Sequence, residues 1–247
     1  SEGMTKGVRN AVRNNNLSLQ NYFTGRQDWD SDISGIQSLK TLFNIISSPG
    51  GRLIYLFGPQ GSGKTDFAIL KAEFLNEIKG VEVATNIKSL SENVEQVKYI
   101  DNYEEMNDWL RTDGRKYYIL DEASSLLTGY YSDSGDVIDA FKDFITKLRK
   151  NNSNICLIGH SGKDIHPLFR RLAVFMHKKG KKKVEMYRTA STSDSGEVRG
   201  HDKLVELNKI PATNWKYRTD EESTFYINTD SEAKKYTEEE LQEMIDA

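Results

Sequence analysis

The chain of 247 residues is long enough for one α/β domain with additions, or for two small domains. Its formal net charge of −3 excludes a globally basic nucleic-acid-binding protein, so any contact with nucleic acid must come from a local patch. A single cysteine excludes an intrachain disulfide, and no apolar run approaches the length of a membrane span. We therefore expect a cytoplasmic protein without a membrane span.

The first part of the chain predicts an arm, a helix and a strand. Residues 1–30 are polar and rich in asparagine, a composition typical of a flexible arm. Apolar residues then recur at helical spacing between residues 36 and 46, and a Ser-Pro-Gly-Gly sequence at residues 48–51 predicts the end of that helix. The apolar run at residues 52–57 predicts a buried strand.

Residues 58–65 match the phosphate-binding P-loop pattern G-x-x-x-x-G-K-[ST] at every constrained position. The strand before the loop and the periodic helical pattern at residues 66–79 supply the structural context that this motif requires. Glycines let several backbone N–H groups converge on one anion at the start of a helix. We expect Lys64 to reach the β- and γ-phosphates of ATP and the Thr65 hydroxyl to bind Mg²⁺. The predicted nucleotide-binding residues are Gly58, Pro59, Gln60, Gly61, Ser62, Gly63, Lys64, Thr65 and Asp66.

Beyond Gly80, which predicts the end of that helix, strands and helices alternate. The expected elements are strands at residues 81–87 and 97–100, a helix at 101–112 capped by Asp101, a strand at 116–121, a helix at 136–150, a strand at 154–159 and a short helix at 164–172. This alternation predicts a mainly parallel sheet covered by helices on both faces.

The strand at residues 116–121 ends in two adjacent carboxylates. Two acids after a strand are usually a helix cap or a solvated turn, but together with a P-loop they indicate a metal ligand and a base. We expect Asp121 to hold Mg²⁺ and Glu122 to orient or deprotonate the attacking water. A glutamate in this place is typical of hydrolysing motor ATPases rather than of GTPase switches or small-molecule kinases.

The strand at residues 154–159 ends in His160, which either has a structural role or senses the γ-phosphate and the attacking water. Arginines neutralise the charge that develops on a transferred phosphoryl group. The candidates, each of which is alternatively an ordinary surface charge, are Arg149, Arg170 and Arg171. Arg149, at the end of the preceding helix, is slightly favoured.

The last third of the chain predicts a β-hairpin, with strands at residues 173–177 and 183–188 joined by a lysine-rich turn. A polar loop at residues 189–200, an edge strand at 223–228 and a short acidic helix from Thr237 follow. The turn lysines fit a solvated hairpin tip and a loop that binds DNA phosphates equally well. They are Lys178, Lys179, Lys181, Lys182 and Lys183.

The order of these motifs resembles the FtsK–HerA superfamily of P-loop ATPases, especially viral genome-packaging ATPases and Zot-like proteins. The resemblance covers about residues 53–171 and rests on the segments at residues 58–65, 84–87, 120–123, 148–151 and 155–160. It implies a RecA-like core, assembly into a ring that is usually a hexamer, and movement of double-stranded DNA by ATP hydrolysis. The family commonly has glutamine or asparagine where this chain has His160.

The sequence therefore predicts an α/β protein with a flexible arm at residues 1–30, a RecA-like P-loop ATPase core at 31–175, and a C-terminal extension of hairpin, loop and acidic helix at 176–247.

The leading hypothesis is a Mg²⁺-dependent ATPase that translocates double-stranded DNA as a ring-shaped packaging or DNA-transfer motor. If it is viral, it acts in the host cytoplasm or the virion. The catalytic arginine then comes from a neighbouring subunit. The alternative is an ATP-switched loader or adaptor for a replication or secretion partner. A kinase is disfavoured because the chain lacks an arginine-rich lid, and a GTPase because it lacks an Asn-Lys-x-Asp motif.

Overall fold

The computed structural model describes residues 52–122, 146–160 and 173–226, except residues 196, 209 and 211. The expected N-terminal arm, the helix before the P-loop strand, most of the helix at 136–150, the short helix at 164–172 and the acidic C-terminal helix lie outside the described residues. The elements in chain order are β1 (Arg52–Phe57), α4 (Lys64–Lys79), β2 (Glu82–Thr85), α5 (Lys88–Asn93), β3 (Val97–Tyr99), α6 (Tyr103–Arg111), β4 (Lys116–Leu120), β5 (Asn154–Gly159), β6 (Ala173–Gly180), β7 (Lys183–Thr192) and β8 (Val198–Leu207).

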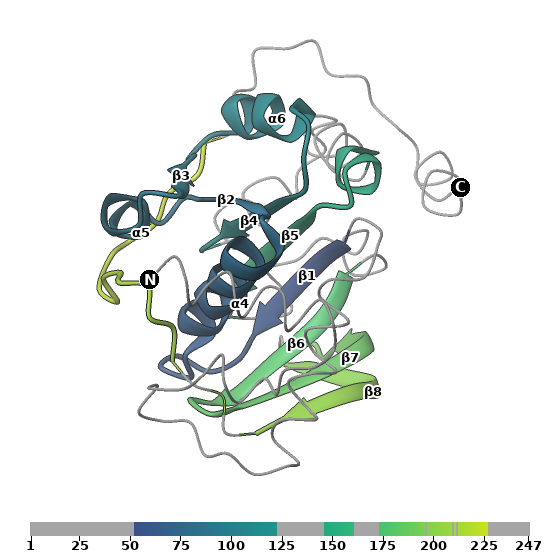
Figure 1. Cartoon of the computed structure of the whole chain (residues 1–247). Coiled ribbons are helices and arrows are strands. Elements are labelled where there is room, and N and C mark those ends of the chain that lie inside the picture. The colour runs from purple at the N-terminus through teal and green to yellow at the C-terminus, as the bar shows by residue number, and fades with distance from the viewer. Residues whose placement is uncertain are drawn as a thin grey trace, which may run out of the picture.

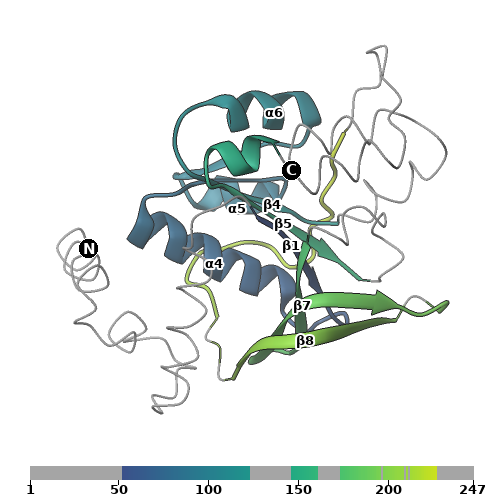
Figure 2. The same ribbon diagram turned by 90° about the vertical axis from the view of Figure 1, so that its right-hand side faces the viewer.

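All these strands belong to one sheet, in the order β3-β2-β4-β5-β1-β6-β7-β8. Every pairing from β3 to β6 is parallel, and β7 and β8 continue the sheet in antiparallel fashion. Helices α4 and α6 lie on opposite sides of the central strands (Figure 1, Figure 2). The expected α/β fold, a mainly parallel sheet flanked by helices, is confirmed.

The central strands are apolar along their whole length because both faces of the sheet are covered. Successive side chains of a strand point to opposite faces, so β1 contributes Ile54 and Leu56 to the core beneath α4. Its alternate residues Leu53, Tyr55 and Phe57 belong to the core beneath α6. This double coverage holds the carboxyl ends of β1, β4 and β5 in fixed relative positions, which is what a site at that edge needs.

Most of the expected elements are present, with shifted ends. Helix α4 begins at Lys64, two residues earlier than expected, and Gly80 ends it in the left-handed conformation at φ 68°. The cap of α6 is Asn102 and not Asp101, because the Asn102 side chain accepts a hydrogen bond from the Glu105 amide. The short helix α5 was not expected, since its six residues carry no helical periodicity.

The hairpin belongs to the central sheet. Strand β6 runs through the expected boundary at residue 175 and pairs in parallel with β1, so in the described residues the sheet is continuous across that boundary. The expected loop at residues 189–200 is wrong, because β7 and β8 extend into it and pair from Thr189 with His201 to Thr192 with Val198. These strand ends are polar and largely exposed, and so lack the alternating apolar pattern from which a strand is predicted.

After β8 the chain crosses back over the carboxyl edge of the sheet as an irregular stretch, residues 212–226, which we call the C-terminal segment. It passes α4 and α5 and reaches the level of β3 (Figure 1). Hydrogen bonds tie it to Glu73 of α4 through Thr213 and Asn214, and to Ser89 of α5 through the Arg218 amide. The expected edge strand at residues 223–228 is reduced, in its described part, to a single parallel bridge between Asn102 and Tyr226.

Candidate functional site

A cavity of about 550 Å³ lies at the carboxyl ends of the parallel strands. Ligands of open α/β sheets bind at this edge, because loops from several strands converge there. P-loop residues, the two carboxylates after β4 and the histidine after β5 line it together. The lining residues are Gln60, Gly61, Gly63, Lys64, Thr65, Asp66, Ile87, Asp121, Glu122, Ile158, His160, Lys181, Lys182, Ile210, Ala212, Tyr217, Arg218, Thr219 and Glu221.

The P-loop has the backbone shape of an anion cradle. Gly61 and Gly63 take positive φ angles of 74° and 82°, which residues with a Cβ rarely adopt. Gly58 also has a positive φ, 150°, and a Cβ there would come within 2.3 Å of the Lys178 carbonyl oxygen. The loop therefore owes its curvature to three glycines, and one of them also allows its close contact with β6.

Lys64 and Ser62 are the two buried polar side chains of the loop. Lys64 is only 6 % exposed, and its ammonium donates to the carbonyl oxygens of Gly58 at 2.8 Å and Pro59 at 3.0 Å. Burial lowers the pKa of Lys64, and the nearby Asp121 and Glu122 oppose that shift. The Ser62 hydroxyl is buried and, within the described part of the chain, has no hydrogen-bond partner. Such a buried polar atom normally has a partner, but Ser62 does not line the cavity, so its hydroxyl is not assigned to the phosphate.

Asp121 is held in place by Asn86, which follows β2. The Asn86 side chain accepts from the Asp121 amide at 2.8 Å and donates to the Asp121 carbonyl at 3.0 Å. A third bond, from the Thr85 hydroxyl to the Ile119 carbonyl at 2.9 Å, joins the ends of β2 and β4. The side chains of Thr85 and Asn86 thus fix the end of the strand that precedes both acids.

Asp121 and Thr65 fit a magnesium ion. Mg²⁺ is usually bound through one or two protein oxygens, with phosphate and water completing its shell. Both side chains line the cavity, and no larger group of metal-ligating side chains occurs among the described residues. Burial, followed by repulsion from Glu122, raises the pKa of Asp121 to about 6, while the Glu122 amide, His160 and Lys64 act against the rise. The carboxyl group is thus mostly ionised at neutral pH.

Glu122 and His160 come from neighbouring strands β4 and β5, and the structure brings them together. The Glu122 Oε1 atom lies 3.2 Å from the His160 Nε2 atom, and both side chains are partly exposed at the cavity. Glu122 takes a positive φ of 54°, an unfavourable conformation for a residue with a side chain. Because β5 lies between β4 and β1, His160 stands between the acids and the P-loop strand.

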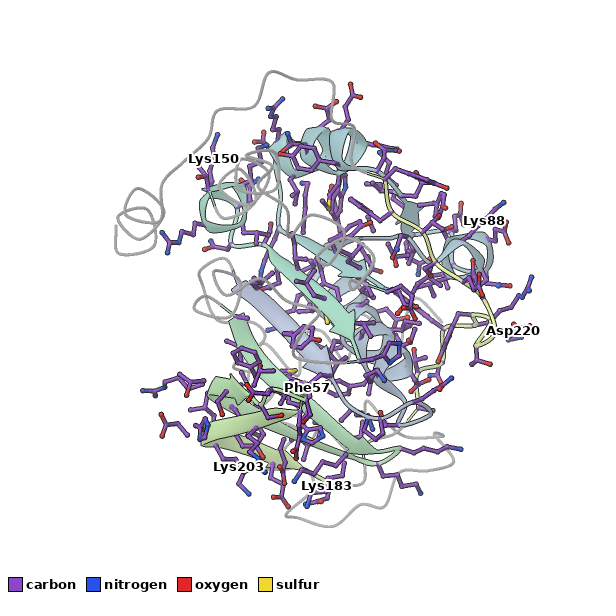
Figure 3. The ribbon with its side chains drawn as sticks, turned by 180° about the vertical axis from the view of Figure 1, so that it is seen from behind. Phe57, Lys88, Lys150, Lys183, Lys203 and Asp220 are labelled. Carbon is purple, nitrogen blue, oxygen red and sulfur yellow. The ribbon has the colours of Figure 1, made fainter. Side chains whose placement is uncertain are left out.

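The candidate arginines do not line the cavity among the described residues. Arg170 and Arg171 lie outside the described residues. Arg149 is exposed and precedes β5, whose first residue pairs with Arg52 at the amino end of β1. The P-loop follows the opposite end of β1, about 20 Å away for a six-residue strand. Lys183 directly follows Lys182, which lines the cavity. Lys150, the neighbour of Arg149, lies at the other end of the molecule from Lys183 (Figure 3). Arg149 is therefore too far from the cavity of its own chain to act there.

The five turn lysines do not form one exposed patch. Lys178 is a correction to that expectation, because it is 1 % exposed within β6 and donates to the carbonyls of Gly180 and Lys181. Lys179 and Lys183 pair with Glu185 of β7 at 3.0 Å and 3.6 Å. The remaining two, Lys181 and Lys182, line the cavity.

Sequence reasoning missed the contribution of the C-terminal segment. Tyr217, Arg218 and Glu221 line the cavity although the P-loop and the two carboxylates lie more than 90 residues earlier. Burial and the negative charges of Asp66 and Asp121 raise the pKa of Tyr217. No local sequence pattern predicts that these residues belong to the site, because they lie in irregular backbone and not in a helix or strand.

No protein-family model and no curated protein matches the sequence. Among solved structures, the chain is similar to the N-terminal domain of zonular occludens toxin from Neisseria meningitidis, with 18 % identity, a TM-score of 0.43, and coverage of 63 % of this chain and 95 % of that one. It is also similar to B204, the DNA-packaging ATPase from Sulfolobus turreted icosahedral virus, with 13 % identity, a TM-score of 0.43, and coverage of 63 % and 98 %. The genome-packaging NTPase B204 of Sulfolobus turreted icosahedral virus 2, in complex with ATP-gammaS, gives 14 % identity, a TM-score of 0.44, and coverage of 64 % and 100 %.

These proteins are of the two kinds that the motif order resembles, viral genome-packaging NTPases and a Zot protein. At such identities and TM-scores the similarity by itself carries no conclusion about activity. The functional assignment rests on the cavity and the side chains that line it. None of the described helices is long and apolar enough to cross a membrane.

Proposed function

We propose that the protein is a Mg²⁺-dependent ATPase whose hydrolysis cycle drives double-stranded DNA through a hexameric ring of subunits, as a packaging or DNA-transfer motor. One observation carries the enzymatic part: Lys64, Thr65, Asp121 and Glu122 line a single cavity at the carboxyl edge of the sheet. The ring and the DNA follow from the motif resemblance to FtsK–HerA proteins and extend that enzymatic core.

In this mechanism the backbone amides of residues 61–65 and the Lys64 ammonium bind the β- and γ-phosphates of ATP. A magnesium ion, when bound, neutralises phosphate charge, and the Thr65 hydroxyl and the Asp121 carboxylate are the residues that would hold it. The Glu122 carboxylate orients the attacking water and accepts its proton. His160, within hydrogen-bond distance of Glu122, holds that carboxylate and reports the state of the γ-phosphate.

Two variants separate binding from chemistry. Lys64→Ala removes the ammonium from the cradle and should abolish both ATP binding and turnover. Glu122→Gln keeps the shape of the side chain but not its basicity, so ATP should still bind while turnover falls by about 100-fold or more. Equilibrium binding of a fluorescent ATP analogue and steady-state phosphate release measure the two quantities. Equal turnover in Glu122→Gln and the unaltered protein would contradict the role of Glu122.

The motor is tested by turnover with and without duplex DNA at low and moderate salt, since phosphate contacts weaken as salt rises. We expect duplex DNA to stimulate turnover and Lys64→Ala to remove the stimulation. Turnover that does not respond to DNA at either salt concentration would contradict the motor. It would leave the ATPase itself intact.

A second candidate, a loader or adaptor switched by ATP, is favoured by the C-terminal segment. This segment lines the cavity through Tyr217 and also contacts α5 and α6, so a change at the nucleotide can reach a distant surface. Stable ATP binding with negligible turnover would favour this switch over the motor.

A further inference from the structure

The turn between β6 and β7 lies directly beside the P-loop. Strand β6 pairs with β1 up to Phe57 and His177, then continues past the end of β1 to Gly180. The overhang is in close contact with the loop, because the Lys178 carbonyl occupies the space that a Cβ on Gly58 would need. The Cα atom of Lys181 lies 3.9 Å from the Cβ position of Gly63, beside the centre of the phosphate cradle.

Lys178 holds this turn in shape. Its ammonium is buried and donates to the Gly180 carbonyl and, at 2.6 Å, to the Lys181 carbonyl. The turn is also fixed from outside, because the Ile210 amide donates to the Lys182 carbonyl at 3.1 Å. The carbonyls of Gly180, Lys181 and Lys182 thus all face protein donors. Lys181 and Lys182 are therefore presented at the cavity by a braced turn.

The charge of the cavity shows what these two lysines contribute. Its lining includes four basic residues, Lys64, Lys181, Lys182 and Arg218, and four acidic ones, Asp66, Asp121, Glu122 and Glu221. Without Lys181 and Lys182 the four carboxylates would face only two cationic side chains, Lys64 and Arg218, and the attraction of the cavity for a polyphosphate would be weaker. Two further lysines of the turn, Lys179 and Lys183, pair with Glu185 on β7.

We propose that the β6–β7 turn is a second phosphate-binding element, in which Lys181 and Lys182 bind the polyphosphate of the nucleotide instead of DNA. This inference rests on the proposed nucleotide site. It adds two lysines that follow β6 on one side of the P-loop strand β1, whereas Asp121 and Glu122 follow β4 on the other side. It also changes the meaning of the lysine-rich sequence, whose two cavity-lining members belong to the ATP site of their own chain.

The test is equilibrium binding of AMP, ADP and ATP, and separately of nucleotide-free duplex DNA, to the double variant Lys181→Ala/Lys182→Ala. We expect ATP affinity to fall about tenfold to 100-fold, and AMP affinity to fall much less, because the lost interaction grows with phosphate charge. DNA affinity should stay within about twofold of that of the unaltered protein. The matched control is Lys150→Ala/Lys216→Ala, which removes two exposed lysines outside the cavity and should keep ATP affinity.

A second double variant, Lys181→Arg/Lys182→Arg, keeps both charges and should retain ATP affinity within about threefold, which separates loss of charge from damage to the turn. Unchanged ATP affinity with weakened DNA binding in the alanine variant would overturn the proposal and make the lysines DNA contacts. Equal losses for AMP and ATP would also overturn it. If the unaltered protein bound no nucleotide, the proposed function would fail first.

Discussion

At the scale of single residues, the buried carboxylate of Asp121 lowers the stability of the folded chain when it is charged. The pKa of Asp121 is raised to about 6, above the usual value of an aspartic acid in an unfolded chain. Between about pH 4 and pH 6 the folded state therefore holds more protons than the unfolded state, and the contribution of Asp121 to stability is lost as pH rises through 6. The charged carboxylate that we propose to hold magnesium thus costs stability at neutral pH.

We therefore expect Asp121→Asn to raise the free energy of unfolding at pH 7.5 by about 1–3 kcal/mol, with the gain disappearing below about pH 4. The amide oxygen can still accept from the Glu122 amide, so the turn should keep its shape. Urea unfolding across this pH range measures the effect. The same variant should lose magnesium-dependent ATP binding. If the variant were less stable than the unaltered protein at pH 7.5, the raised pKa of Asp121 would be contradicted.

At the scale of elements, the C-terminal segment stabilises a helix that cannot cap itself. Helix α5 has Ile87 at its N-cap, which makes no side-chain hydrogen bond to the helix. Glu221, which is distant in sequence, caps the helix instead. Its two carboxylate oxygens accept from the Ser89 amide at 3.1 Å and 3.0 Å. A carboxylate at a helix amino end also interacts favourably with the helix dipole.

Glu221→Ala should therefore lower the free energy of unfolding by about 1 kcal/mol. It should also make residues 212–226 more susceptible to limited proteolysis, since one of their attachments is lost. Glu222→Ala is the matched control, because Glu222 is the exposed neighbour of Glu221. Equal proteolysis rates in the two variants would show that Glu221 does not attach the segment to α5.

At the scale of the whole molecule, the parallel sheet separates Arg149 from the cavity of its own chain. Arg149 lies beyond the amino ends of the strands and the P-loop follows their carboxyl ends. If Arg149 is the catalytic arginine, it must therefore act on the site of a neighbouring subunit, and the ring is required for activity. A ring places one edge of each subunit against the opposite edge of the next.

Mixing two inactive variants tests this arrangement. Arg149→Ala lacks the arginine and Glu122→Gln lacks the base, and each alone should be at least about tenfold less active than the unaltered protein. In an equal mixture, about a quarter of the sites combine an intact Glu122 with an intact Arg149 from the neighbour, so turnover should recover to about a quarter. Arg111→Ala, a change at an exposed arginine on α6, is the control and should keep full activity. A mixture no more active than its two components would exclude Arg149 as an arginine acting between subunits.

The fold class and the centre of the site could be predicted because their determinants are local in sequence. A P-loop needs its glycines, Lys64 and Thr65 within eight residues, and the two acids need only an apolar strand before them. Local patterns also placed β1, α4, β4 and β5, whose apolar runs reflect burial on both faces. They failed for the polar ends of β7 and β8, which hydrogen bonds hold together without an apolar face.

The sequence by itself thus determined that the chain has a P-loop, a pair of carboxylates and an α/β core, because each is encoded in consecutive residues. Only the tertiary structure decided which other groups meet them. Pairing of β6 with β1 brings Lys181 beside Gly63 and places Lys182 at the cavity, and the same parallel arrangement places Arg149 at the opposite edge. The crossing of residues 212–226 adds Tyr217, Arg218 and Glu221 to the cavity. These placements depend on contacts between distant parts of the chain, which no local spacing of residues records.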